Sequence, residues 1–117
     1  MLLNETSFQD VIPIQGYGKN NFKIDDKFYK GGIFIFSNTI SKWGGFEDFS
    51  FSKLDINDME IIFIGTGVRN NKLNKRYKDF FIKKNITVEC LTTPTACRAY
   101  NVTISSQRKA GALLIPL

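Results

Sequence analysis

The chain has 117 residues, of which 43% are apolar, carries a net charge of +5 and contains no histidine. This length suits one domain, and this apolar content excludes a disordered chain. The absence of histidine excludes His-based triads and His-ligated metals, and two cysteines leave too few ligands for a structural zinc site. We therefore expect a single domain over residues 1–117, without a metal or a cofactor.

The two cysteines, Cys90 and Cys97, are fewer than a small secreted domain normally carries, which indicates a reducing compartment. The first ten residues lack the basic start and apolar run of a signal peptide. The apolar runs fall far short of the ~20 residues that cross a bilayer, so no transmembrane segment is predicted. These features predict a cytoplasmic protein.

The first half of the chain has the pattern of a β-structure. Short apolar segments alternate with turn residues: Asp25-Asp26 suits a tight hairpin turn, and Ser37-Asn38 suits another. An irregular connection, Gly44–Lys53, then contains three phenylalanines. The predicted strands are Val11–Ile14, Phe22–Ile24, Lys27–Tyr29, Ile33–Phe36 and Thr39–Trp43.

The second half predicts alternating strands and helices. A continuous apolar run indicates a strand at Ile61–Ile64 that is covered on both faces. Ile86–Leu91 is predicted as a second buried strand, and Ala110–Ile115 closes the chain. Helical spacing predicts a helix over Lys72–Lys84 and another that starts near Thr92 or Thr93, with Pro94 in its first turn. Strands followed by β-α-β-α-β predict a three-layer α/β fold, with a central mixed sheet, helices packed on it and an additional N-terminal β layer.

A glycine pair, Gly65-Thr66-Gly67, follows the buried strand at Ile61–Ile64. Glycines there could let a phosphate approach the backbone. The third glycine of a dinucleotide fingerprint is missing, as is the Gly-Lys-Ser/Thr of a P-loop. We favour a structural turn and keep the ligand loop as the alternative.

The polar segment from Thr92 to Asn101 lies where a strand ends and a helix begins, a place where α/β sheets gather ligands. Cys97 is a conceivable nucleophile there, but no histidine can act as its base. Its spacing with Tyr100 and Ile104 predicts instead an inward-facing, unreactive thiol. Cys90, within an apolar strand, is expected in the core.

Charged residues offer three further candidates. Arg108 could clamp the end of the second helix through backbone carbonyls or Asn101, which predicts a largely buried side chain, or it could reach an anion. The helix over Lys72–Lys84 carries six cations and one acid, as a phosphate-binding face would. We favour an ordinary charged outer face and expect no nucleic-acid binding. Two acidic pairs, Asp25-Asp26 and Glu47-Asp48, are expected to be solvated.

The chain resembles a known family over about residues 10–117. It is similar to the Mth-type domain family, which includes the mitochondrial complex I assembly factor three and the adipogenesis-associated Mth domain protein. The resemblance implies a three-layer α/β fold with a mixed sheet and no established catalytic activity. It depends on Ile14-Gln15-Gly16-Tyr17-Gly18, Gly31-Gly32, Trp43, Ile64-Gly65-Thr66-Gly67, Thr92, Ala96-Cys97-Arg98, Tyr100-Asn101, Arg108 and Ala112-Leu113-Leu114.

Two functions follow as hypotheses. The first is a non-catalytic interaction module that binds other proteins and assists assembly of a respiratory or membrane complex, as the resemblance implies. The second is a small anionic-ligand protein, or an unrecognised enzyme, that uses a cleft between the glycine turn and the following helix. Its candidate ligand-binding residues are Gly65, Thr66, Gly67, Thr92, Thr93, Cys97, Arg98, Tyr100, Asn101 and Arg108; no catalytic residue is assigned.

Overall fold

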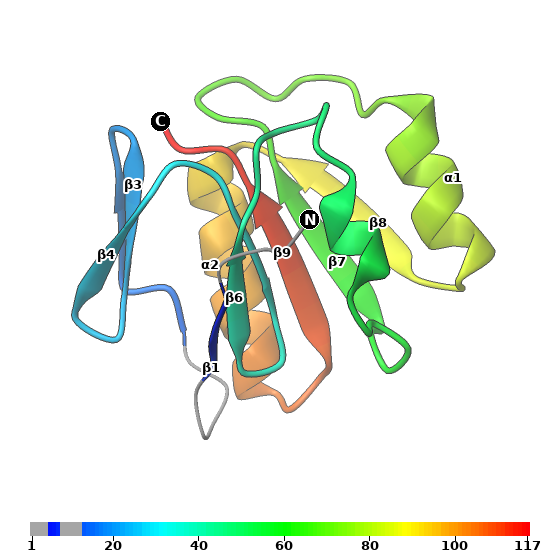
Figure 1. Ribbon diagram of the computed structural model, residues 1–117, viewed down its shortest axis with the longest axis horizontal. Coiled ribbons are helices and arrows are strands. Elements are labelled where there is room, and N and C mark those ends of the chain that lie inside the picture. Colours follow the sequence, from blue (N-terminus) through cyan, green and yellow to red (C-terminus); the bar gives the residue numbers. More distant parts are fainter. Residues whose placement is uncertain (1–4, 8–12) are drawn as a thin grey trace.

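The computed structural model describes residues 5–7 and 13–117, which form two β-sheets and two α-helices (Figure 1). The central sheet has six strands in the order β1-β6-β5-β9-β7-β8, and the smaller sheet has the order β2-β3-β4. The strands are β1 Glu5–Ser7, β2 Gly16–Gly18, β3 Asn21–Ile24, β4 Lys27–Lys30, β5 Ile33–Phe36, β6 Thr39–Lys42, β7 Ile61–Gly65, β8 Thr87–Leu91 and β9 Ala110–Leu114. The helices are α1 Lys75–Lys83, α2 Thr93–Ser105 and a 3₁₀ turn, η1 Ser50–Lys53.

The central sheet is mixed, as predicted. Strand β7 pairs in parallel with β8 and β9, as two β-α-β units require, whereas β5 pairs antiparallel with β6 and β9. The three-layer α/β fold predicted from the sequence is therefore confirmed. Of the predicted strand Val11–Ile14, residues 11 and 12 lie outside the described residues, and Ile14 is a buried residue ahead of β2.

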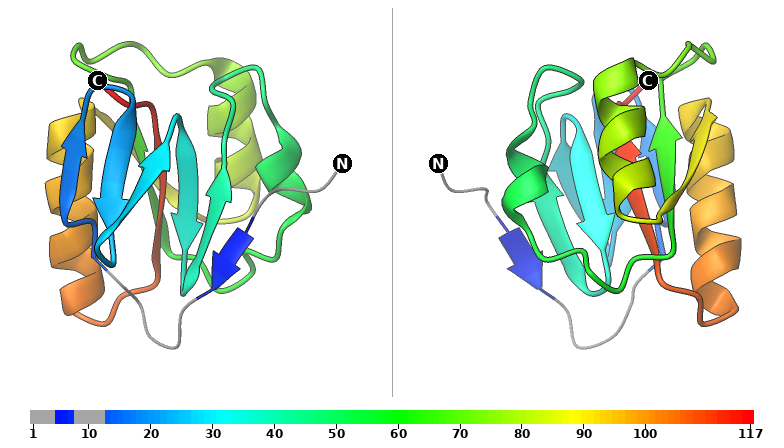
Figure 2. Two further views of the ribbon diagram at one scale, coloured as in Figure 1. Left: turned by 60° about the vertical axis from the view of Figure 1, so that its left-hand side comes forward. Right: turned by 90° about the vertical axis from the view of Figure 1, so that its right-hand side faces the viewer.

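Strand β7 divides the core into two parts because its side chains alternate between the faces of the sheet. Ile61 and Phe63 pack with α2 and the small sheet, whereas Ile62 and Ile64 pack with α1 and η1. Every residue of β7 is buried, which explains its uninterrupted apolar sequence. Figure 2 shows the small sheet and α2 on one side of the central sheet and α1 on the other.

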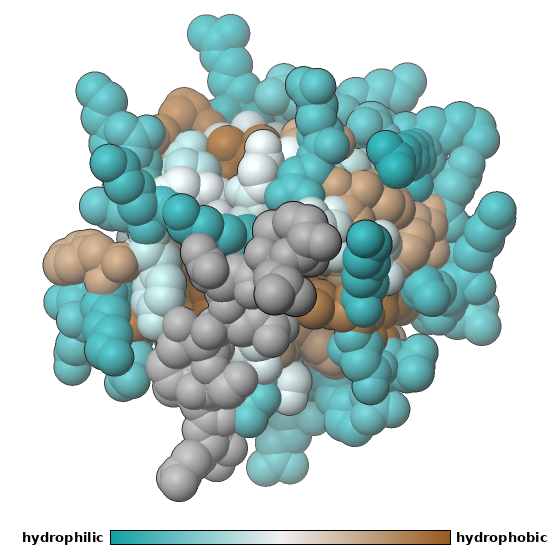
Figure 3. Space-filling model, in the orientation of Figure 1, coloured by the Kyte–Doolittle hydropathy of each residue, from teal (hydrophilic) through white to brown (hydrophobic). Residues whose placement is uncertain are grey.

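The layer that holds α1 is unusually rich in aromatic side chains. The Trp43 indole N–H and the Tyr77 hydroxyl both donate to the Asp48 carbonyl, at 3.0 and 2.9 Å. The phenyl ring of Phe51 stacks on that of Phe81 at 5.7 Å between centroids. Figure 3 shows hydrophobic side chains gathered over η1 and α1 among hydrophilic ones. These contacts hold the irregular 44–53 connection against the helix.

Two predicted elements need correction. The helix expected over Lys72–Lys84 begins only at Lys75, because the Asn74 side chain caps it by accepting from the Tyr77 amide at 3.2 Å. Strand β8 is not buried as predicted: it lies at the edge of the sheet, and Thr87 and Glu89 are exposed. The hydrophobic pattern of a strand indicates which of its faces are covered, but it does not indicate whether both of its edges are paired with other strands.

Candidate functional site

The glycine turn after β7 is bonded directly to the first residue of α2. The Gly67 amide donates to Thr93 Oγ1 at 2.8 Å, and the Thr93 amide donates to the Gly67 carbonyl at 2.8 Å. Thr93 Oγ1 also donates to the Ile115 carbonyl at 2.6 Å, and the residue is fully buried. One hydroxyl thus joins the ends of β7, α2 and β9, and both the Gly67 and Thr93 amides already have partners within the chain.

The two glycines of this turn are needed for different reasons. A Cβ on Gly65 would lie 2.9 Å from the Thr93 Cα and from a Leu114 methyl, so there is no room for a side chain. Gly67 has free space around it but a φ of +94°, which disfavours other residues. Thr66 closes the turn, since its hydroxyl donates to the Arg69 carbonyl at 2.6 Å. These are the contacts of a structural turn.

Neither cysteine is placed as a nucleophile. Cys97 is 2% exposed, and burial raises the pKa of its thiol to about 12, although the Arg98 charge lowers it slightly. Cys90 was expected in the core, but it lies half-buried on β8, where its thiol donates to the Asn71 carbonyl at 3.3 Å. Partial burial raises the pKa of Cys90 as well. Both thiols therefore stay protonated at neutral pH.

The other candidates on α2 connect this helix to the N-terminal part of the chain. The Asn101 side chain accepts from the Ile14 amide and donates to the Ile14 carbonyl, both at 2.8 Å. Arg98 is exposed and donates to the Tyr17 hydroxyl at 3.3 Å. Tyr100 is fully buried in the core between α2 and the small sheet, and burial raises the pKa of its hydroxyl. These residues do not converge on the glycine turn.

Arg108 is not the buried clamp that the sequence predicted. Its side chain is 52% exposed, and its Nε lies 3.6 Å from Glu60 Oε1. The turn after α2 is closed by backbone bonds instead: the amides of Gln107 and Arg108 donate to the carbonyls of Ile104 and Thr103. Because the helix end is satisfied in this way, no role is left there for a guanidinium.

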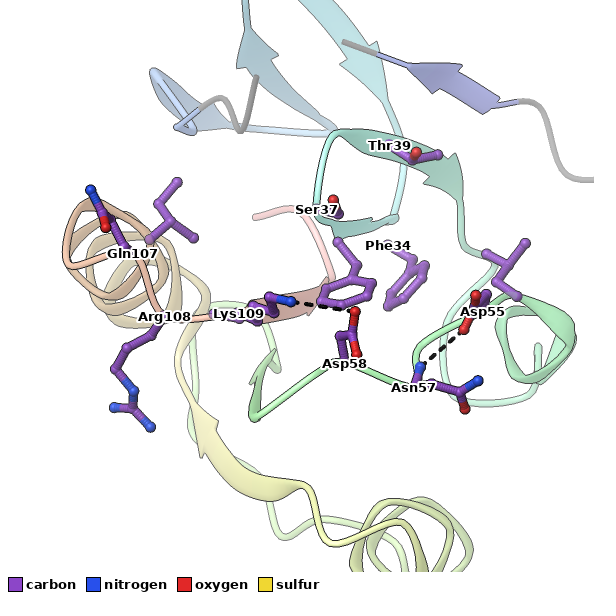
Figure 4. Close-up of a pocket in the computed structure, with 13 residues that line it drawn as sticks. Phe34, Ser37, Thr39, Asp55, Asn57, Asp58, Gln107, Arg108 and Lys109 are labelled. Atoms are coloured by element: carbon purple, nitrogen blue, oxygen red, sulfur yellow. Dashed lines mark hydrogen bonds and ion pairs between the residues drawn. The ribbon is translucent and has the colours of Figure 1, made fainter. Parts of the chain in front are cut away.

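A cavity of about 670 Å³ opens at the end of the sheet opposite the glycine turn (Figure 4). Its lining includes Phe34 and Phe36 of β5, and Lys109 Nζ lies 3.3 Å from Asp58 Oδ2 beside these rings. Arg108 also lines the cavity, but Figure 4 shows its guanidinium turned away from the rings. The cavity thus combines phenylalanine rings with polar side chains, and Lys109 is already paired with Asp58.

A second cavity, of about 630 Å³, lies beside Trp43 and Gly44, and Lys30, Lys42 and Asp48 contribute to its lining. Asp48 is not simply solvated as predicted: it accepts from the amide of Gly44 at 2.8 Å and from the amide and hydroxyl of Ser50. These bonds, above all the one from the Ser50 hydroxyl, hold the pKa of Asp48 below its usual value. The carboxylate therefore shapes the 44–50 loop.

Comparison with known proteins places the chain in a family. Residues 14–115 match the family described as "protein of unknown function (DUF498/DUF598)". The chain belongs to the DUF498/DUF598 family. It is 29% identical to an uncharacterized protein of Rhodobacter capsulatus over 117 residues, all of this chain and 94% of that protein.

Named relatives of this DUF498/DUF598 protein confirm the resemblance found in its sequence. It is 30% identical over 110 residues to the Danio rerio protein named NADH dehydrogenase (ubiquinone) 1 alpha subcomplex assembly factor 3. That match covers 88% of this chain but 63% of the fish protein, so the chain spans less than two thirds of this relative. A solution structure from Bordetella pertussis, titled a Mth938-like domain, has the same fold, with a TM-score of 0.73 at 18% identity over 99% of this chain and 92% of that one.

The cavities of this DUF498/DUF598 protein were not predictable from local motifs. The larger one is formed by segments around Phe36, Leu54 and Lys109, which are distant in sequence and carry no shared pattern. Of the residues that line this larger cavity, Arg108 alone was predicted from the sequence as a candidate ligand-binding residue. Within residues 5–7 and 13–117, no group of three or more His, Cys, Asp or Glu is placed to hold a metal ion.

Proposed function

We propose that this protein is a non-catalytic binding module that assists the assembly of a respiratory or other membrane complex. The observation that carries the proposal is its match to proteins named as NADH dehydrogenase assembly factors, which extends over 88–97% of the chain. The whole relatives are longer, so the proposal concerns the part of their activity that this domain supplies. It includes a cytoplasmic location, which fractionation of native cells would test.

The placement of the reactive residues supports this proposal. The best nucleophile candidate, Cys97, is buried and protonated. The side chains of Thr93 and Asn101 form hydrogen bonds with the backbone of other parts of the same chain. Arg108 is exposed and weakly paired. Polar side chains that bond to their own backbone stabilise a scaffold. A scaffold that presents surfaces to partners is what an assembly module requires. No helix in the described part of the chain is both long and apolar enough to cross a bilayer.

Purification of the tagged protein from native cells, with and without crosslinking, tests the proposal by quantitative mass spectrometry. We expect enrichment of respiratory-complex subunits or of proteins that assemble them. A cell line expressing the tag alone is the control. If no protein exceeds that control in either condition, the assembly role is wrong.

A small anionic ligand is the second candidate, and the cavity near Trp43 favours it. Two lysines, Lys30 and Lys42, line this cavity together with the backbone of Gly31-Gly32. The cavity also includes Ile115, whose carbonyl bonds to Thr93, so it lies close to the predicted cleft. Thermal melts with inorganic phosphate would show a concentration-dependent rise in Tm that Lys42→Ala removes. An unchanged Tm at every concentration would reject this candidate.

A further inference from the structure

Strand β8 ends the central sheet among the described strands, and one of its edges is free. The Thr87 amide donates to the Glu60 carbonyl, and the Leu91 carbonyl accepts from the Thr66 amide. In a parallel ladder, alternate residues of a strand bond to the same neighbour, so Thr87, Glu89 and Leu91 face β7. The N–H and C=O groups of Val88 and Cys90 therefore point outward, as a template for another strand.

A flank of α1 that carries the exposed Ile82 lies beside this free edge. Arg76 covers the Phe49 ring at 4.1 Å, which orients that side of the helix toward the 44–53 connection. Lys78 and Ile82 are on the opposite flank by helical geometry, and α1 contacts β8. Ile82 is 53% exposed, and the half-buried Val88 belongs to the same side of the sheet. A strand added to β8 would cover both side chains.

The charge of the protein is concentrated in the same region. Residues 66–91 contain seven Lys or Arg and two Asp or Glu, whereas the rest of the chain has nine of each sign. The entire net charge of +5 thus belongs to the segment that forms α1 and β8. A partner that binds here gains from negative charge. A second copy of this chain would instead bring two basic helices together.

From these three observations we infer that the β8 edge binds an extended, acidic segment of a partner protein, which adds to the central sheet as a further strand. Backbone groups of Val88 and Cys90 supply the hydrogen bonds. Every second side chain of the added strand points to the α1 side of the sheet, where apolar ones meet Ile82 and Val88 and acidic ones meet the cation Lys78. Nucleic acid uses neither a strand edge nor an exposed Ile82, so the surface fits a peptide better. The inference rests on the proposed function and names its surface and the chemistry of its partner.

Titration with short synthetic peptides tests the inference by NMR. The probe carries Val and Glu in turn at every second position, with Thr between them, so that both residue types reach the α1 side of the sheet; one control replaces Glu by Lys, and another is N-methylated at alternate residues. We expect the acidic probe to shift the Val88 and Cys90 amide signals and to slow their hydrogen exchange, and both controls to bind at least about tenfold more weakly. Equal binding of the N-methylated peptide, or shifts confined to other regions, would overturn strand addition.

Two surface variants test whether this edge binds the partner that is recovered from cells. Ile82→Glu with Val88→Glu opposes an acidic strand by like charge, whereas Val102→Glu, at a residue 66% exposed on α2, is the matched control. Both variants are first checked by thermal melts and far-UV dichroism. We expect the double variant to recover at least about tenfold less native partner than the wild type, and the control variant to recover as much as the wild type. Equal recovery by the two variants would refute the β8 edge while leaving the assembly role intact.

Two other possible binders of the β8 edge, a second copy of the chain and nucleic acid, would give distinct results with the same variants. A dimer of the wild-type protein in sedimentation, abolished only by the double variant, would show that a second copy covers the edge. Binding of single-stranded DNA at low salt, lost in the double variant, would show a nucleic-acid surface. Either result would overturn the inference of an acidic partner strand.

Discussion

The hydroxyl of Thr93 provides the sharpest test of how this fold is held together. It accepts from Gly67 and donates to Ile115, and no part of the residue reaches solvent. Replacement by valine keeps the shape and leaves the buried Gly67 amide and the half-buried Ile115 carbonyl without this partner. Each lost bond of this kind costs about 1–2 kcal/mol, so Thr93→Val should lower the free energy of unfolding by about 2–4 kcal/mol.

Thermal and urea unfolding measure this loss. With an unfolding entropy of about 2.1 cal/mol/K per residue, the expected fall in Tm is roughly 8–16 °C. Thr93→Ser keeps the hydroxyl and should lose only about 1 kcal/mol, the contribution of one buried methyl. Thr92→Val is the matched control, because Thr92 Oγ1 bonds only to the exposed Thr95 hydroxyl. If Thr93→Val melts within about 2 °C of the wild type, the hydroxyl does not join the three elements.

Three further outcomes follow from particular contacts. Gly65→Ala should destabilise by about 1–3 kcal/mol through overlap with the Thr93 backbone and Gly67→Ala by about 1–2 kcal/mol through its positive φ, and unchanged melts of both would contradict the turn geometry. Arg108→Lys should change stability by less than about 0.5 kcal/mol in urea unfolding, because its ion pair is exposed; a larger loss would restore the buried clamp. Since burial raises the pKa of Cys97 most, a disulfide reagent at pH 8 should modify Cys90 first and Cys97 only on unfolding; rapid reaction of both thiols would show an open core.

Partner binding should also respond to salt. If acidic residues of the partner face the cations of α1, its affinity should fall as the salt concentration rises from 50 to 300 mM, whereas the melting temperature of the free protein should change little. Fluorescence anisotropy of the labelled acidic peptide measures the affinity. An affinity that does not depend on salt would show that charge does not contribute to partner binding, and only the strand addition would remain.

The local sequence determined the elements and their order. Ile61–Ile64 is apolar at every position because β7 is covered on both faces, so its burial could be predicted from four letters. The inward spacing of Cys97 and Tyr100 likewise predicted the buried face of α2. Such patterns repeat over a few residues, because burial acts on each turn or strand separately. The alternation of strands and helices then fixed the fold class.

Only the tertiary structure decided which of these elements lies at an edge and which polar groups meet. β8 carries the polar residues Thr87 and Glu89 where β7 has no polar side chain, and its free edge results from strand order, which depends on contacts between distant segments. Arg108 was expected at the end of α2, but backbone bonds within the turn satisfy those carbonyls first. The clamp role belongs instead to Asn101, whose partner Ile14 is 87 residues away in the chain. Pairing between residues distant in sequence leaves no local periodic signal, so these partners can be identified only from the tertiary structure.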